Sequence, residues 1–176
     1  MDTPAQLRVG IVGCGYQGRL LAQAIGKVDR MQVTACADPV REAADAVAAL
    51  TGHAEVHGSA EELLNKSKVD AVLIATPHHL LQQVALLAID AGKHVLAEKP
   101  IAMNERQAVE IEEAAAKAGI CYLSGYSLRF FAAQQQVRDL LAAGAVGEIQ
   151  AVTAGIGTGP FDGWFAEAEK GGGALL

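Results

Sequence analysis

The glycine-rich turn Gly13–Gly18 constrains the fold of this chain more than any other feature. It reads G-C-G-Y-Q-G, follows an apolar run over Leu7–Val12, and leads into helically spaced apolar residues over Gly18–Val28. A strand, a tight glycine turn and a helix in this order are typical of the phosphate-binding unit of a Rossmann domain. The pattern therefore predicts an α/β fold that binds a dinucleotide at this turn.

Apolar runs and amphipathic segments continue to alternate as far as Ser124. We expect further strands at Met31–Ala37, Val69–Ala75, His94–Ala97 and Cys121–Ser124, and helices at Pro39–Leu50, 59–65, His79–Ala91 and 104–118. Ser59 and Asn104 are the expected N-caps, since Glu62 and Gln107 follow three residues later. Strands that alternate with helices predict a doubly wound parallel sheet, and we assign it to a domain over residues 1–125.

The pattern changes after Gly125. A helix is expected at Phe131–Ala143 and a strand at Glu148–Ile156, followed by a glycine-rich stretch that carries Trp164. We interpret residues 126–176 as the incomplete start of a second, α+β domain.

Composition narrows the function classes. The 176 residues carry a net charge of -6 without a basic block, which argues against binding to nucleic acid. The three cysteines are too far apart for a C-x-x-C pair and suit a reducing compartment. No apolar run is long enough for a membrane span, and the N-terminus lacks a signal core. We therefore expect a cytoplasmic protein with no membrane partner.

The turn and the residues after the second strand predict a cofactor. Gly13 permits the tight turn, Gly15 lets the backbone approach a pyrophosphate, and Gly18 lets the helix pack on the strand. Asp38 follows about 20 residues later, where a carboxylate accepts hydrogen bonds from ribose hydroxyls. NAD is thus favoured, while Arg41 keeps NADP open because a guanidinium can bind a 2′-phosphate. The alternative is a strand-to-helix turn without any ligand.

A second group of candidate site residues follows the later strands. Thr76, Pro77 and His78 come after Val69–Ala75, and Glu98-Lys99-Pro100 follows His94–Ala97. Ligands bind at the carboxyl ends of parallel strands, so we assign Thr76, Pro77 and Lys99 to the cofactor-binding residues. Lys99 is expected to face a nicotinamide or substrate and to serve as proton donor, proton acceptor or hydroxyl clamp. The alternative is a solvated Glu98–Lys99 ion pair.

The sequence resembles the Gfo/Idh/MocA oxidoreductases. The matching segments are Gly13–Gly18, Ala75–Pro77 and A-G-K-H-V-L-A-E-K-P over Ala91–Pro100. The resemblance implies NAD(P)-dependent hydride transfer to or from a secondary alcohol of a sugar, inositol or related polyol. It implies that Lys99 holds the reacting hydroxyl and that Glu98 lies near the nicotinamide ribose. Tyr16 and Gln17, within the turn, are added to the cofactor-binding residues.

The same resemblance suggests further residues and one departure. Arg129 matches a family arginine near the nicotinamide or substrate, against a surface arginine as alternative. Trp164 matches a tryptophan that borders the substrate pocket, against packing of the second domain. The peptide before Pro100 is cis in some relatives. His78 stands where the family usually has asparagine; we take it as a cofactor contact, with a polar residue at a helix start as the alternative.

The end of the chain sets the remaining expectations. In relatives, a segment like Gly171–Leu176 is followed by an aspartate and then a histidine and aspartate that provide the general base. We therefore expect a truncated enzyme with impaired turnover that binds a small polyol or sugar and forms a homo-oligomer. A non-catalytic NAD(H)-binding sensor or partner-binding module is the alternative, and Glu98-Lys99-Pro100 disfavours another nucleotide such as S-adenosylmethionine. No metal site is expected.

Overall fold

The computed structural model describes residues 6–52, 54–155 and 162–173. The chain divides into two compact units: Met1–Gly125 together with Gly163–Leu176, and Tyr126–Asp162. The domain boundaries 1–125 and 126–176 stay a prediction. In this structure the stretch that begins at Gly163 packs on the first unit.

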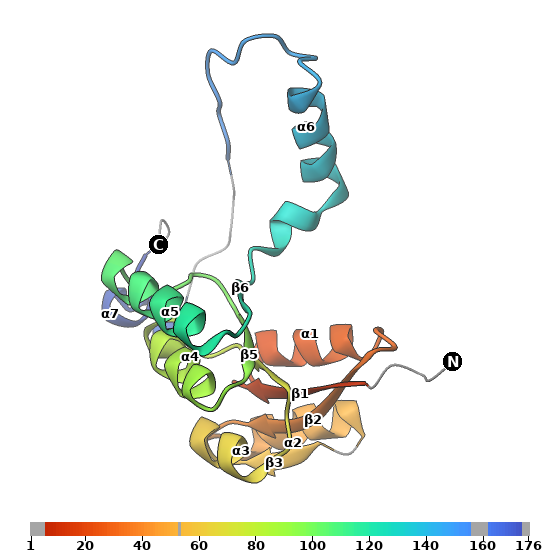
Figure 1. The fold of residues 1–176 in the computed structure, drawn as a ribbon, viewed down its shortest axis with the longest axis vertical. Helices are drawn as coiled ribbons and strands as arrows, with labels where there is room; N and C mark the ends of the chain where they lie inside the picture. Colours follow the sequence, from red (N-terminus) through yellow and green to blue (C-terminus); the bar gives the residue numbers. More distant parts are fainter. Residues whose placement is uncertain (1–5, 53, 156–161, 174–176) are drawn as a thin grey trace. The chain divides into compact units, whose positions relative to one another are not determined.

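Six strands form one parallel sheet in the order β3-β2-β1-β4-β5-β6 (Figure 1). They are β1 (Leu7–Val12), β2 (Met31–Ala37), β3 (Glu55–His57), β4 (Ala71–Ile74), β5 (His94–Ala97) and β6 (Tyr122–Ser124). The order reverses between β1 and β4, which is the arrangement of a doubly wound dinucleotide-binding sheet. The predicted fold class is confirmed.

The register aligns the strand ends at one edge of the sheet. Val12 at the end of β1 pairs with both Ala37 of β2 and Ile74 of β4. Ile74 pairs in turn with Ala97 of β5. The loops that follow these strands, which carry most of the predicted site residues, therefore leave the sheet side by side.

Helices connect the strands. The α-helices are α1 (Tyr16–Ile25), α2 (Arg41–Thr51), α3 (Ala60–Lys66), α4 (Leu81–Asp90), α5 (Glu105–Ala118), α6 (Ala132–Ala142) and α7 (Ala168–Gly171), and the 3-10 helices are η1 (His78–Leu80), η2 (Ser127–Phe130) and η3 (Gly163–Ala166). Both predicted N-caps are confirmed. Ser59 Oγ accepts from Glu62 N at 3.2 Å, and Asn104 Oδ1 accepts from Gln107 N at 3.1 Å. None of the helices in the described ranges is long and apolar enough to cross a membrane.

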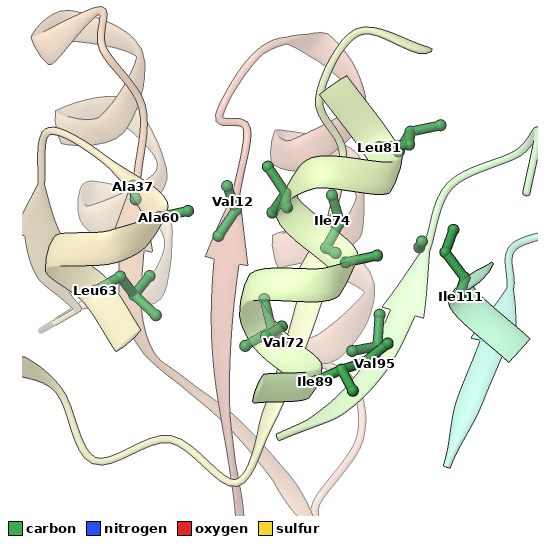
Figure 2. Packing of buried hydrophobic residues seen from close by; sticks show 14 of the residues in the cluster. Val12, Ala37, Ala60, Leu63, Val72, Ile74, Leu81, Ile89, Val95 and Ile111 are labelled. Carbon is green, nitrogen blue, oxygen red and sulfur yellow. The ribbon is translucent and has the colours of Figure 1, made fainter. Parts of the chain in front are cut away.

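Side chains that alternate along the strands fill a core on each face of the sheet. Val9 and Ile11 of β1 pack with Ala22 of α1 and Val47 of α2. On the other face, Val12, Val72, Ile74 and Val95 pack with residues of α3, α4 and α5, as Figure 2 shows around α4. Burial on both faces explains why these strands are continuous apolar runs.

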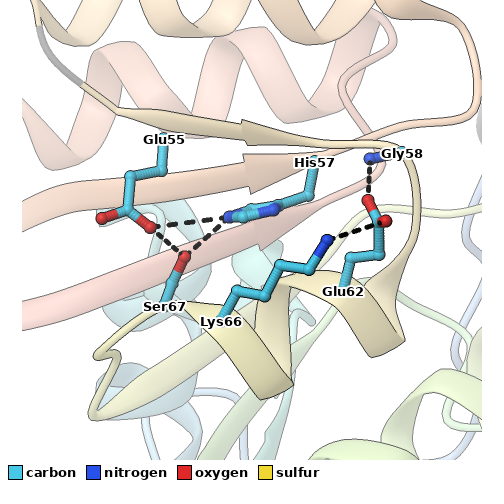
Figure 3. Close-up of polar contacts among 6 residues, drawn as sticks. All are labelled: Glu55, His57, Gly58, Glu62, Lys66 and Ser67. Atoms are coloured by element: carbon cyan, nitrogen blue, oxygen red, sulfur yellow. Dashed lines mark hydrogen bonds and ion pairs between the residues drawn. The ribbon is translucent and has the colours of Figure 1, made fainter.

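The edge strand β3 was not predicted, because Glu55-Val56-His57 is too short and polar to show a strand pattern. Side-chain contacts with Ser67, the residue after α3, hold β3 in place, and Gly58 N, just beyond the strand, donates to Glu62 of α3 (Figure 3). Ser67 Oγ donates to the Glu55 carboxylate and lies 2.7 Å from His57 Nε2. These contacts join two segments that local sequence does not relate.

The second unit corrects one prediction. The expected strand at Glu148–Ile156 is wrong over 148–155, where the structure has no strand, and Ile156 lies outside the described residues. The apolar side chains of this run are exposed, with Ile149 at 55% and Val152 at 82%. An isolated strand leaves its backbone groups unpaired, and no neighbouring strand of the described residues pairs with this one.

Candidate cofactor and active site

The site begins at the point where the strand order reverses. β1 lies between β2 and β4, and Ala75 N, just beyond β4, donates to Val12 O at 2.8 Å. Helices that follow the two strands leave on opposite faces of the sheet, so a crevice opens between them. The glycine turn and the Ala75–His78 loop flank this crevice.

Two of the three glycines are required by the packing of the protein itself. Gly13 has a φ of 91°, and a Cβ there would lie 2.6 Å from the backbone carbon and oxygen of Ala75. A Cβ on Gly18 would lie 2.0 Å from Gly13 O. Any side chain at either position would push the turn apart.

Gly15 is different. Apart from its chain neighbours, no atom of the described residues lies within 4 Å of a Cβ built on Gly15, and its φ of -66° suits any residue. Gly15 is also the N-cap of α1, whose first turn carries no acidic side chain. The open space and the free N–H groups of the helix start fit a phosphate that approaches the backbone.

Asp38 is tied to the turn. Its Oδ2 accepts from Cys14 N at 2.8 Å, and its Oδ1 accepts from Val40 N at 2.8 Å. Each oxygen has capacity for another donor, such as a ribose hydroxyl. Arg41 instead pairs with Asp45 at 2.8 Å, and its side chain is 71% exposed. The guanidinium that could bind the 2′-phosphate of NADP is thus paired with an acidic residue of α2.

Gln17, in the middle of the glycine turn, contacts one of the predicted site residues that follow β5. Gln17 Nε2 donates to Glu98 Oε1 at 2.7 Å. The other oxygen of Glu98 accepts from Lys99 N at 3.2 Å, and the Lys99–Pro100 peptide is cis. The structure therefore brings Gln17, Glu98 and Lys99 together. Tyr16 is 73% exposed and lines a groove between α1 and α2.

His78 lies at the start of η1 and is buried. Its Nδ1 lies 2.8 Å from Gly171 O, and its ring packs at 4.9 Å from Trp164 and 5.0 Å from Phe165. Burial lowers the pKa of His78, and the nearby positive charge of Lys99 lowers it further, although the hydrogen bond to Gly171 opposes both. His78 is therefore neutral at pH 7.

Trp164 and Phe165 come from the C-terminal stretch of the first unit. Their rings pack at 5.0 Å from each other. The Phe165 ring lies 5.5 Å from Lys99 Nζ, within the range of a cation–π contact. Sequence reasoning chose Trp164 and missed both Phe165 and Gly171, because only the tertiary fold brings this stretch back to Lys99.

A buried polar atom supports a ligand near β4. Thr76 Oγ1 is buried and has no hydrogen-bond partner among the residues that the structure describes. Together with the open Gly15 backbone, this orphaned hydroxyl fits a ligand that supplies polar groups, as a dinucleotide does. Pro77 is half-buried beside it. Arg129 lies on η2 in the other unit, and its role stays a prediction.

The comparison with known families decides the class. A family model described as the oxidoreductase family with an NAD-binding Rossmann fold, Gfo/Idh/MocA, matches residues 7–126. The chain belongs to the Gfo/Idh/MocA oxidoreductase family. NAD is thus the cofactor that the fold of this family binds, and the residues around Gly15, Asp38 and Thr76 fit it.

Several Gfo/Idh/MocA proteins are similar over much of the chain. A dTDP-3,4-didehydro-2,6-dideoxy-alpha-D-glucose 3-reductase from Streptomyces violaceoruber is 34% identical over 99% of this chain and 52% of its own length. A trans-1,2-dihydrobenzene-1,2-diol dehydrogenase from Xenopus laevis is 35% identical, over 82% of this chain and 44% of its own. The chain therefore spans about half the length of these relatives.

Solved structures of two dehydrogenases are similar in fold to this chain. A scyllo-inositol dehydrogenase from Lactobacillus casei, with bound NAD(H) and scyllo-inositol, has a TM-score of 0.77 at 26% identity, over 81% of this chain and 43% of that one. The WlbA dehydrogenase from Bordetella pertussis, in complex with NADH and UDP-GlcNAcA, has a TM-score of 0.77 at 31% identity over the same shares. Among the described residues of this family member, no group of three or more metal-binding side chains gathers.

Proposed function

We propose that this chain binds NAD along the Gly13–Gly18 turn and serves hydride transfer to or from a secondary alcohol of a sugar, inositol or related polyol. One observation carries the proposal. Gln17 of the turn donates to Glu98 at 2.7 Å, so the phosphate-binding backbone and Lys99 border the same crevice. The inositol and the sugar named for a similar dehydrogenase and a similar reductase support the choice of a sugar or polyol.

Different residues along the crevice hold different parts of the cofactor. The backbone from Gly13 to Gly18 holds the pyrophosphate at the start of α1, and Asp38 accepts from the adenosine ribose. Glu98, fixed by Gln17, accepts from the ribose at the other end. When bound, NAD supplies the carbon that exchanges a hydride with the substrate.

Lys99 acts on the substrate oxygen. Its side chain is exposed, so its ammonium group is free to donate a hydrogen bond to the reacting hydroxyl. That bond stabilises the negative charge that grows on the oxygen as its proton passes to water during oxidation. Trp164 contributes an apolar ring beside this oxygen, since sugars and polyols pack their C–H faces on aromatic rings.

The other expectations are part of the same proposal. We infer that Thr76 and Pro77 contribute to the cofactor end of the site. The roles of His78 as a direct cofactor contact and of Arg129 stay predictions from the sequence. The homo-oligomer and the impaired turnover of this chain stay predictions.

A paired substitution tests the proposal. Lys99→Met removes the donor to the substrate, and Lys117→Met is the control because Lys117 is an exposed lysine at the far end of α5. NADH binding is followed by its fluorescence, and turnover is measured with NAD and a panel that includes myo-inositol and scyllo-inositol.

We expect every protein to bind NADH with similar affinity. Lys99→Met should lower polyol oxidation by about 100-fold, within the range of a lost acid–base group. Tight NADH binding without turnover of any polyol by the unmodified chain would favour the non-catalytic module instead. Failure to bind either dinucleotide would refute the proposal.

A further inference from the structure

We propose that His78 is a positioning residue that docks the segment Gly163–Gly172, here called the aromatic strap, beside Lys99. The proposal rests on the proposed function, because it concerns the surroundings of Lys99. It assigns His78 a different role from a direct cofactor contact. It stands on the contacts that His78 makes with three residues of the strap.

The strongest contact is a buried hydrogen bond. A backbone carbonyl only accepts, so the 2.8 Å contact between His78 Nδ1 and Gly171 O places the hydrogen on Nδ1. His78 is 7% exposed, and its ring meets Trp164 and Phe165 edge-on at 4.9 and 5.0 Å. One imidazole thus contacts both helices of the strap, η3 and α7.

The strap has a compact shape of its own. Gly171 N donates to Glu167 O at 2.7 Å, and a Cβ on Gly171 would lie 2.3 Å from Phe165 O. Glycine at this position lets α7 close against η3. His78 therefore meets a preformed turn, and its contacts set where that turn sits on the first unit.

Docking brings an aromatic ring to the ammonium group of Lys99. The Phe165 ring lies 5.5 Å from Lys99 Nζ, so the strap limits the positions that the ammonium group can adopt. Loss of the imidazole would remove the hydrogen bond to Gly171 and the ring contacts with both Trp164 and Phe165. The Phe165 ring would then no longer orient the Lys99 ammonium group toward a substrate hydroxyl.

The charge state of His78 suits this position. A charged imidazole would place a second positive group near Lys99. The other titratable groups that face His78 are Glu98 and the neighbouring His79. Burial and the nearby Lys99 lower the pKa of His78 and outweigh the hydrogen bond to Gly171, so His78 is neutral, Nδ1 donates to Gly171 O and Nε2 remains an acceptor.

Trp164 reports on the strap directly, because it is the only tryptophan in the chain. The experiment compares its emission and its quenching by acrylamide in the unmodified chain, in His78→Phe and in His78→Asn. His78→Phe keeps a ring without the donor, and His78→Asn keeps a donor without the ring. His79→Asn is the matched control, since His79 is the exposed neighbour.

We expect both His78 variants to raise the accessibility of Trp164 to acrylamide by at least twofold and to weaken energy transfer from Trp164 to bound NADH. His79→Asn should do neither. NADH affinity should change less than threefold, whereas kcat for a polyol should fall about tenfold or more, because the reacting group is misplaced. Unchanged tryptophan accessibility and energy transfer in both His78 variants would overturn the proposal.

A second measurement needs no variant to fold. A protonated imidazole quenches a neighbouring indole, so Trp164 emission of the unmodified chain should fall as the pH drops below the ordinary range of histidine. A flat titration would also overturn the proposal. If the unmodified chain does not bind NADH, the proposed function fails, while the acrylamide and pH measurements still test the docking.

Discussion

Substitution of the turn glycines separates packing from cofactor binding. Gly15→Ala adds a methyl group where, apart from its chain neighbours, no atom of the described residues lies within 4 Å and where φ is -66°, so unfolding free energy should change by less than about 0.5 kcal/mol. Gly18→Ala places a Cβ 2.0 Å from Gly13 O, and such overpacking costs about 1–3 kcal/mol or more. Gly18→Ala should thus destabilise the fold, whereas Gly15→Ala should leave it almost unchanged.

Gly15→Ala should weaken cofactor binding although it leaves folding almost unchanged. A methyl group at the start of α1 keeps a pyrophosphate from the backbone N–H groups, and a hydrogen bond to a charged group is worth about 1.5–3 kcal/mol. Loss of one such bond raises the Kd for NADH about 10- to 150-fold. Gly15→Ala is therefore expected to be a stable protein that binds NADH poorly.

The assay combines urea unfolding with NADH fluorescence titration. Gly26→Ala is the matched control, because it lies at the other end of α1 and its added Cβ comes no closer than 3.6 Å to its neighbours. It should leave NADH affinity unchanged. If Gly15→Ala binds NADH as tightly as the unmodified chain, then the phosphates do not approach this backbone and the reasoning is refuted.

Two further predictions concern stability. Leu63 is fully buried, so Leu63→Ala should cost about 2–5 kcal/mol in urea unfolding, and a loss below about 1 kcal/mol would contradict the packing described for α3. The Arg8 guanidinium and backbone N–H hold the pKa of Asp70 below its usual value of 3.8, so the stability that Asp70 contributes is present above that value and is lost as the pH falls below it. The urea midpoint should therefore fall less steeply with acid for Asp70→Asn than for the unmodified chain, and parallel curves would contradict this assignment.

Local sequence determined the elements whose signals are short-range. The strands at Leu7–Val12, Met31–Ala37 and His94–Ala97 have the bounds that their apolar runs predict. The helix that Asn104 caps ends before Gly119, which has a φ of 65°. These features depend on side-chain burial and capping within a few residues, so the sequence alone specifies them.

Two errors came from segments whose structure depends on a partner. Glu55–His57 forms a strand although its pattern is weak, because β2 and Ser67 hold it. The run from Glu148 has the pattern of a strand but forms none over 148–155, where no strand pairs with it. Whether a segment forms a strand depends on its neighbour, since each hydrogen bond of a β-ladder joins two strands.

The candidate site divides in the same way. The glycine spacing, Asp38 and Glu98-Lys99-Pro100 are local motifs, and sequence was enough to choose them. The tertiary fold decided that Gln17 meets Glu98, and that His78 binds a carbonyl 93 residues further along the chain. Such contacts depend on strand order and on the return of the aromatic strap to the sheet edge, which no pattern of neighbouring residues encodes.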